Sequence, residues 1–388
     1  MIIESLRRGC AVACLVLTVT AAQAVEIRIA DGDNPGEGLN DPTPRAPVGG
    51  NPGVTVGEQR RNALQFVANL LGNRIASDVP IVVEVKFSNL NCEPNNADLA
   101  AAGPRRLVSD VPGGQPGVFY ALALANAING SRIQDEPPPD ILAEFNAALD
   151  APDDCLGGAD WYYGLDNDPP DGDLNFVTTA AHELIHGLGF ASFADLGSGE
   201  FFMGLPSVYE TCIADRSFDT TWPGLTNNER MASAENDGNV IWVGPSISSR
   251  IANGFSSGVS NGRLLLYAPN PFEGGSSISH WDDNLTPNAL MEPFVDSRGD
   301  VDIRQGIGVA ACVLADLGWT MQNTSLCSSP SPDGLAGCPV QSNAGISPPD
   351  STGGDGGGGG CSLARGALDP IWLLLLLAAA WRLRRSAA

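Results

Sequence analysis

The residues best suited to chemistry lie in the segment His182-Glu183-Leu184-Ile185-His186. On a helix, positions four apart share one face, so both imidazoles would point the same way. Two imidazoles at this spacing can hold one side of a Zn²⁺ ion at about 2.0–2.1 Å. Glu183 is then placed to act on a metal-bound water rather than on the metal. Because the whole chain has only three histidines, this pattern indicates a metal site rather than an ordinary core helix.

The residues around this motif have the features of a buried helix with defined ends. Asn175 is a candidate N-cap, and the residues from there to Ala181 are mostly small or apolar. After the motif, Gly189 can adopt the left-handed conformation that ends a helix and turns the chain. We therefore expect a helix through the motif, followed by a sharp turn.

A third ligand must come from elsewhere, because catalytic zinc normally has three protein ligands and keeps a fourth position for water. The common extension of the motif would place a histidine at position 192, where this chain has Ser192. His280 is the only histidine left. Glu210 is the alternative, since in gluzincins a glutamate on the next helix completes the site. The segment before Glu210 contains a proline and lacks that helical motif, so the sequence favours His280.

Two further segments carry a family resemblance. Ser279-His280-Trp281-Asp282 is followed by Asn288-Ala289-Leu290-Met291-Glu292-Pro293, a methionine close to a proline. Together with the helix motif and its glycine turn, they resemble a metzincin metallopeptidase. The likeness is closest to the leishmanolysin-like branch, in which a long insertion separates the glycine turn from the third histidine.

This resemblance implies roles for individual residues and a fold for roughly residues 57–322. The implied zinc ligands are His182, His186 and His280, the implied general base is Glu183, and Met291 would form a hydrophobic floor under the metal. The implied fold is α/β (α+β), with a twisted sheet over the zinc-binding helix and with the Met-turn and a C-terminal helix below it. Pro293 stands where some metzincins have a metal-facing tyrosine, so we expect no tyrosine role.

Hydrophobic patterning predicts the elements on either side of the motif. We expect a helix over 57–72, strands over 80–87, 117–124 and 161–164, two strands at 238–243 and 263–267 within an insertion at 191–279, and a helix over 303–317. The insertion either shapes one wall of a substrate cleft or only extends the fold.

The two ends of the chain have the composition of export and sorting segments. We expect a secretory signal peptide over 1–24, a Gly/Pro/Asp-rich surface arm or short pro-segment over 25–56, a Ser/Pro/Gly-rich linker over 323–360, and over 361–388 a C-terminal sorting signal with a short hydrophobic run. This order predicts a protein secreted or held at the cell surface of a Gram-negative bacterium. A retained transmembrane helix is the alternative for the tail.

Export favours disulfides among the cysteines that follow the signal peptide. Six of them form an even set: Cys92, Cys155, Cys212, Cys312, Cys327 and Cys338. The sequence does not choose among their pairings, although Cys327 with Cys338 would close the easiest local loop. A cysteine zinc site is disfavoured, because no Cys-x-x-Cys pair occurs.

The net charge of −24 argues against nucleic acid as a partner, because phosphate contacts need a basic surface. Acidic loops suit hard cations instead, and Asp166, Asp168, Asp171 and Asp173 form the best candidate Ca²⁺ loop, although a solvated loop explains them equally well. The sequence thus predicts a zinc-dependent endopeptidase acting on proteins or peptides. The alternative is a non-catalytic surface binding or adhesion protein with a structural or inactive zinc site.

Overall fold

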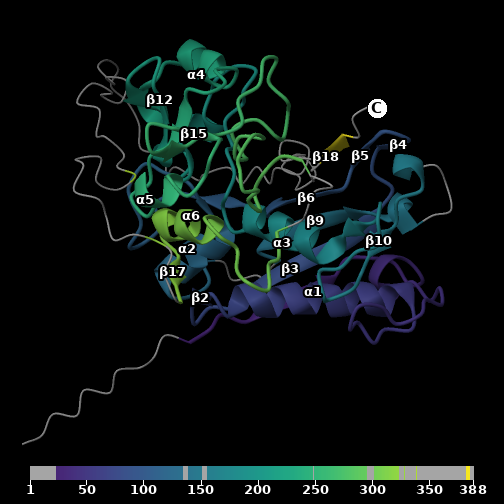
Figure 1. Cartoon of the computed structure of the whole chain (residues 1–388). Helices are drawn as coiled ribbons and strands as arrows, with labels where there is room; N and C mark the ends of the chain where they lie inside the picture. Colours follow the sequence, from purple (N-terminus) through teal and green to yellow (C-terminus); the bar gives the residue numbers. More distant parts are fainter. Residues whose placement is uncertain are drawn as a thin grey trace, which may run out of the picture.

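The computed structural model describes residues 23–133, 139–150, 155–247, 249–294 and 301–322, together with Cys327, Cys338 and 382–384. Over these residues the chain has a mixed α+β fold, as expected: one four-stranded sheet carries two long helices, and the remaining strands are short (Figure 1).

The four-stranded sheet has the strand order β1-β3-β9-β6. β1 (Ile27–Asp31), β3 (Ile81–Ser88) and β9 (Ile141–Asn146) are parallel, and β6 (Ala100–Pro104) runs antiparallel to β9 at the edge. Alternate residues of β3 are buried, as the β-branched pattern over 80–87 predicts. That predicted strand is confirmed.

Two helices pack against this sheet and against each other: α1 (Val56–Gly72) and α3 (Phe176–Gly187) (Figure 1). The helix predicted over 57–72 is therefore confirmed. Every residue of α3 is buried. Its close approach to β9 depends on Gly187, because a Cβ there would lie 2.3 Å from Cγ2 of Ile141.

The other elements are short and lie between the sheet strands and α3, within the insertion, or in the C-terminal region. They are β2 (Ile75–Ala76), β4 (Cys92–Glu93), β5 (Asn96–Asp98), β7 (Leu107–Val108), β8 (Tyr120–Ala121), α2 (Leu122–Asn129), β10 (Trp161–Tyr162), β11 (Leu174–Asn175), β12 (Ile213–Asp215), β13 (Thr220–Thr221), α4 (Asn227–Ser233), β14 (Val240–Trp242), α5 (Ser249–Ala252), β15 (Val259–Ser260), β16 (Arg263–Leu264), α6 (Ala310–Leu317), β17 (Thr320–Met321) and β18 (Arg382–Arg384). In the insertion, β12 pairs with β13 and β14, and β15 pairs with β16.

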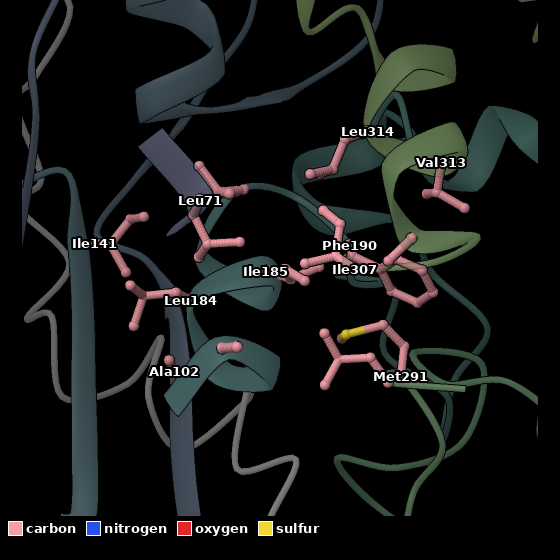
Figure 2. Packing of buried hydrophobic residues seen from close by; sticks show 14 of the residues in the cluster. Leu71, Ala102, Ile141, Leu184, Ile185, Phe190, Met291, Ile307, Val313 and Leu314 are labelled. Carbon is pink, nitrogen blue, oxygen red and sulfur yellow. The ribbon is translucent and has the colours of Figure 1, made fainter. Parts of the chain in front are cut away.

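One hydrophobic core joins the four-stranded sheet to the C-terminal region through α3. The four-stranded sheet with α1 and α3 is called the sheet side below. Figure 2 shows Leu184 near Ile141 of β9, and Ile185 near Phe190 and Ile307. The core continues to Met291 and to Leu314 of α6. The helix that carries the motif is therefore surrounded by packed side chains contributed from distant parts of the chain.

Several of the predicted elements differ in the structure. The expected surface arm over 25–56 begins instead with β1, whose Ile27 is buried against β3. The strand expected over 117–124 is limited to β8, and Leu122–Asn129 is a helix, because alanine and leucine favour helix once the tertiary packing allows it. The helix expected over 303–317 starts only at Ala310, because Gly306 and Gly308 have positive φ angles of 143° and 55°.

The strand predicted at 238–243 forms as β14, whereas those at 161–164 and 263–267 are reduced to the two-residue strands β10 and β16. In the rest of the segment predicted over 263–267, Leu265 and Leu266 form isolated bridges instead of a continuous strand. Period-two patterning finds such segments but not how far their pairing extends.

Three disulfides connect the six cysteines: Cys92–Cys155, Cys212–Cys338 and Cys312–Cys327. Pairing of Cys327 with Cys338 as the easiest local loop is therefore wrong. Cys327 is instead bonded to α6, and Cys338 to the insertion. Packing of the folded chain, rather than closeness in sequence, decides these pairs.

The predicted signal peptide, linker and sorting tail lie almost wholly outside the described residues. β18 from the tail pairs with β5. No helix in the described ranges is long and apolar enough to cross a bilayer.

Candidate metal site

Three histidine side chains from two distant segments converge at the centre of the molecule. The Nε2 atoms of His182 and His186 are 3.0 Å apart, and each lies 3.1 Å from Nε2 of His280. All three rings are buried. Within the described residues, they are the only group of three potential metal ligands whose atoms lie within 4.8 Å of one another.

The opposite nitrogen of each ring faces a backbone carbonyl. His182 Nδ1 lies 2.6 Å from Leu290 O, His186 Nδ1 lies 2.6 Å from Phe190 O, and His280 Nδ1 lies 2.8 Å from Ser276 O. A carbonyl only accepts hydrogen bonds, so each Nδ1 must carry the proton and donate. Each Nε2 then presents a lone pair.

Three lone pairs directed at one another at this distance would repel, and a shared cation removes that repulsion. Nitrogens 3.0–3.1 Å apart can all lie about 2.0–2.1 Å from one zinc ion. Histidine ligands of zinc usually donate their second N–H to a carbonyl or carboxylate, as these three do. The donor set therefore fits zinc.

Burial also keeps these imidazoles neutral. The pKa of His182 is lowered well below its usual value by burial and by the two other histidines, and the hydrogen bond to Leu290 opposes this only in part. Burial lowers the pKa of His186 to about 4, and the pKa of His280 is lowered in the same way. Neutral imidazoles are the form that binds metal, so protons compete little at neutral pH.

Besides its two histidines, α3 carries a third buried ionisable side chain, Glu183. It is fully buried, and no hydrogen bond of normal geometry reaches either carboxyl oxygen within the described part of the chain. Burial raises its pKa well above the usual value, and the nearby backbone amide of Ala102 lowers the pKa by a smaller amount. A buried carboxyl without a partner costs stability, so such a group points to a functional use.

Local sequence explains how α3 presents its two histidines. Asn175 caps the helix by accepting a hydrogen bond from Thr178 N at 3.2 Å, as predicted. After the motif, Gly189 has a φ of +113°, a conformation that other residues rarely adopt. The resulting turn brings Phe190 O against His186. The glycine turn thus supplies the hydrogen-bond acceptor for the second histidine.

His280 lies in a loop that its neighbours hold in place. Tyr267 N donates to His280 O at 3.0 Å, and Ile278 N donates to Tyr267 O at 2.7 Å. Ile278 has a φ of +69°, which strains a β-branched residue, and its carbonyl accepts a hydrogen bond from Tyr209 OH at 2.8 Å. The loop therefore keeps a conformation that its own residues disfavour.

Glu210, the rival ligand, has another role in the structure. Its carboxylate is buried and accepts hydrogen bonds from Ser192 Oγ at 2.9 Å and from the backbone amides of Phe193, Ala194 and Ser207 at 2.6, 2.7 and 2.6 Å. It lies outside the histidine cluster. Ser192, at the position of the short-range ligand, points its hydroxyl at Glu210 and not at the histidines.

Two other expectations concern Met291 and calcium. Met291 is buried, its carbonyl accepts a hydrogen bond from Trp281 N at 2.8 Å, and Figure 2 shows its side chain near Phe190 and Ile307. Its place under a metal stays a prediction. Asp166 accepts a hydrogen bond from Tyr162 OH at 2.7 Å, and Asp173 accepts one from Asp160 N at 3.2 Å. The structure therefore does not gather the predicted calcium loop into a three-ligand group.

Sequence reasoning found the three histidines and Glu183 but missed the contribution of Tyr209 and Glu210. The only local sign was an acidic residue inside the largely apolar segment 205–213, where burial requires hydrogen-bond partners. No protein-family model matches the chain, and no curated protein or solved structure is significantly similar to it. The geometry of the site therefore carries the functional argument by itself.

Proposed function

We propose that this protein is a zinc-dependent endopeptidase of the metzincin type, acting on proteins or peptides outside the cell. The observation that carries the proposal is the convergence of the Nε2 atoms of three buried imidazoles beside α3, the helix whose buried Glu183 carboxyl has no hydrogen bond of normal geometry among the described residues. His182, His186 and His280 would hold the zinc.

The remaining chemistry follows from where Glu183 lies. Zinc, when bound, supplies a Lewis acid that polarises the scissile carbonyl and acidifies water. Glu183 would accept the proton of the attacking water and deliver it to the leaving nitrogen.

The edge of the sheet offers a place for an extended substrate. β6 pairs only with β9 in the described part of the chain, and the amide of Ala102 lies beside Glu183, so the outer edge of β6, most of whose residues are buried, runs past the site. A peptide could add to this edge through main-chain hydrogen bonds, with its scissile bond near Glu183.

The non-catalytic alternative has weaker support. A structural zinc site needs its ligands and their hydrogen bonds, but it gains nothing from an unpartnered carboxyl beside them. No feature of the described residues favours a surface binding role over hydrolysis.

The test combines metal analysis with cleavage of a denatured protein such as casein. Glu183→Ala should retain stoichiometric zinc and lose at least about 100-fold in kcat/KM, because it removes the proton acceptor and leaves the ligands. Glu144→Gln is the matched control, since this glutamate lies on β9 and bonds to Ser88 away from the histidines. Full activity in the Glu183→Ala enzyme, or absence of zinc in the wild type, would refute the proposal.

A further inference from the structure

Tyr209 and Glu210 are adjacent residues that hydrogen bonds connect to the loop carrying His280, Tyr209 directly and Glu210 through Ser192. Tyr209 OH donates directly to the carbonyl of Ile278 at 2.8 Å. Glu210 acts through Ser192, whose backbone N–H donates to Ser279 Oγ at 3.1 Å. Ile278 and Ser279 are the two residues immediately before the third histidine.

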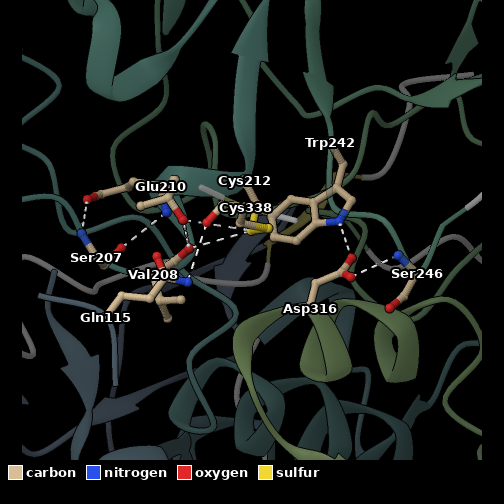
Figure 3. The surroundings of a disulfide bond; sticks show 10 residues. Gln115, Ser207, Val208, Glu210, Cys212, Trp242, Ser246, Asp316 and Cys338 are labelled. Carbon is tan, nitrogen blue, oxygen red and sulfur yellow. Dashed lines mark hydrogen bonds between the residues drawn. A yellow bond between two sulfur atoms is a disulfide. The ribbon is translucent and has the colours of Figure 1, made fainter. Parts of the chain in front are cut away.

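These contacts replace what a short-range ligand would provide. With a histidine at position 192, the turn after α3 would itself deliver the third ligand. Here the same turn is fixed by Glu210, which accepts hydrogen bonds from three consecutive residues, Ser192 to Ala194. That turn holds the distant His280 loop by the hydrogen bond from Ser192 N to Ser279 Oγ. The fourth hydrogen bond of Glu210, from Ser207 N, fixes the carboxylate itself (Figure 3).

We infer that Tyr209 and Glu210 are positioning residues for the third metal ligand, which they act on through the loop 276–280. The inference rests on the proposed zinc site and deepens it. Strain at Ile278 supports it, because a loop held against its own preference relaxes once its supports are removed. Both residues are fully buried, so the hydrogen bonds by which they support the loop are shielded from water.

The clearest test is zinc affinity, measured by competition with a chromophoric chelator at equal concentrations of folded protein. Glu210→Ala should weaken zinc binding by about 10- to 100-fold, the usual cost of losing a group that orients a ligand. Glu210→Gln should lose less, since one amide oxygen can still accept on the Ser192 side while its NH₂ faces Ser207 N–H. Tyr209→Phe keeps the ring contacts with Phe190 and Trp242 and should weaken zinc binding several-fold.

Two controls separate positioning from general stability. Tyr163→Phe also removes a buried tyrosine hydroxyl, one that bonds to Arg60 and Asp150 on the sheet side, and should lower the melting temperature without changing zinc affinity. Ser233→Ala removes a buried serine hydroxyl of the insertion that accepts from Trp222 Nε1, with the same expectation.

A double-mutant cycle then shows whether the effect passes through His280. In a His280→Ala background, Tyr209→Phe should cause no further loss of zinc affinity. A further loss there, or wild-type affinity in folded Tyr209→Phe and Glu210→Gln, would overturn the inference while leaving the zinc peptidase intact. Failure of the wild type to bind zinc would overturn the proposed function, and this inference with it. Should Glu210→Ala fail to fold, the two conservative variants decide.

Discussion

The sheet side of the molecule supplies two of the candidate ligands and the insertion supplies the third, and the two regions are stabilised differently. On the sheet side, Phe176 packs its ring among Phe87, Phe145, Trp161 and Tyr163, with centroid distances of 4.8–5.7 Å. The insertion has only short strands, and besides the ring contacts of Tyr209 with Phe190 and Trp242 it is held by side chains that bond to backbone groups.

Arg230 illustrates the second kind of construction. It is buried and donates to the carbonyls of Gly199, Trp222 and Leu225, each at 2.7 Å. Packing of apolar rings is non-directional, whereas such hydrogen bonds fix position. All three ligand rings bond to backbone carbonyls, but the backbone of the two on α3 is placed by the packed core, whereas the backbone of the loop that carries His280 is placed by further hydrogen bonds.

The largest expected effect on stability is from Phe176→Ala. Removal of this fully buried ring should lower the free energy of unfolding by about 3–5 kcal/mol. Urea unfolding of the disulfide-intact protein measures it. Phe272→Ala in the insertion, where the ring is 36% exposed, is the control and should change stability by less than about 0.5 kcal/mol. Equal effects from the two would mean that the aromatic cluster does not support the sheet side.

Loss of directional bonds in the insertion should have a smaller effect. Arg230→Leu should cost about 1.5–3 kcal/mol, because three buried carbonyls lose a charged donor. Limited proteolysis followed by mass spectrometry should place the first new cuts within 191–279. Arg304→Leu is the control, since that arginine is exposed and bonds only locally to Asp302. First cuts on the sheet side would argue against an insertion stabilised in this way.

The contact between the insertion and α6 should give a pH-dependent effect. Burial raises the pKa of Asp316 above its ordinary 3.8, although hydrogen bonds from Trp242 and Ser246 oppose this. The folded form therefore binds this proton more tightly than the unfolded form, so stability falls as pH rises from 3.8 through the folded pKa. Asp316→Asn should remove this part of the slope in unfolding free energy, which lies above pH 3.8.

An opposite sign is expected for Asp302. The hydrogen bond from Arg304 lowers its pKa from 3.8 to about 2, so its stabilisation is present above 3.8 and is lost as pH falls toward 2. Asp302→Asn should therefore change only the acid limb of the stability curve. For Asp316, an unchanged dependence of unfolding free energy on pH in the Asp316→Asn variant would show that the Asp316 carboxyl keeps its ordinary pKa in the folded protein.

The smallest expected effect is that a histidine introduced at position 192 does not restore the zinc binding lost with His280. Ser192→His restores the common short-range motif, yet in a His280→Ala background it should not recover zinc binding. The side chain at 192 points at Glu210, and the turn that bears it is already fixed by that carboxylate. Zinc content of the folded double variant measures this. Recovery of stoichiometric zinc would show that the turn can reorient, and that the insertion is dispensable for the ligand set.

How much the sequence predicts depends on whether the signal is local. The α3 helix, its Asn175 cap and the Gly189 turn follow from spacing within a few residues, and they were all correct. His280 was identified only because histidine is so rare in this chain. The disulfide pairs and the bonds of Glu210 join residues far apart in sequence, and no periodic pattern reports such contacts.

The Cys212–Cys338 disulfide has a mechanical consequence. Cys212 lies two residues beyond Glu210 and is bonded to Cys338 (Figure 3). A pull applied at Cys338 therefore reaches Cys212 through the disulfide, in parallel with the chain that connects Cys338 to Cys327. If this disulfide is reduced, the same pull passes only along that stretch of chain to Cys327 and so to α6 through Cys312. A single covalent bond thus decides whether tension reaches the molecule beside the His280 loop as well as at its C-terminal helix.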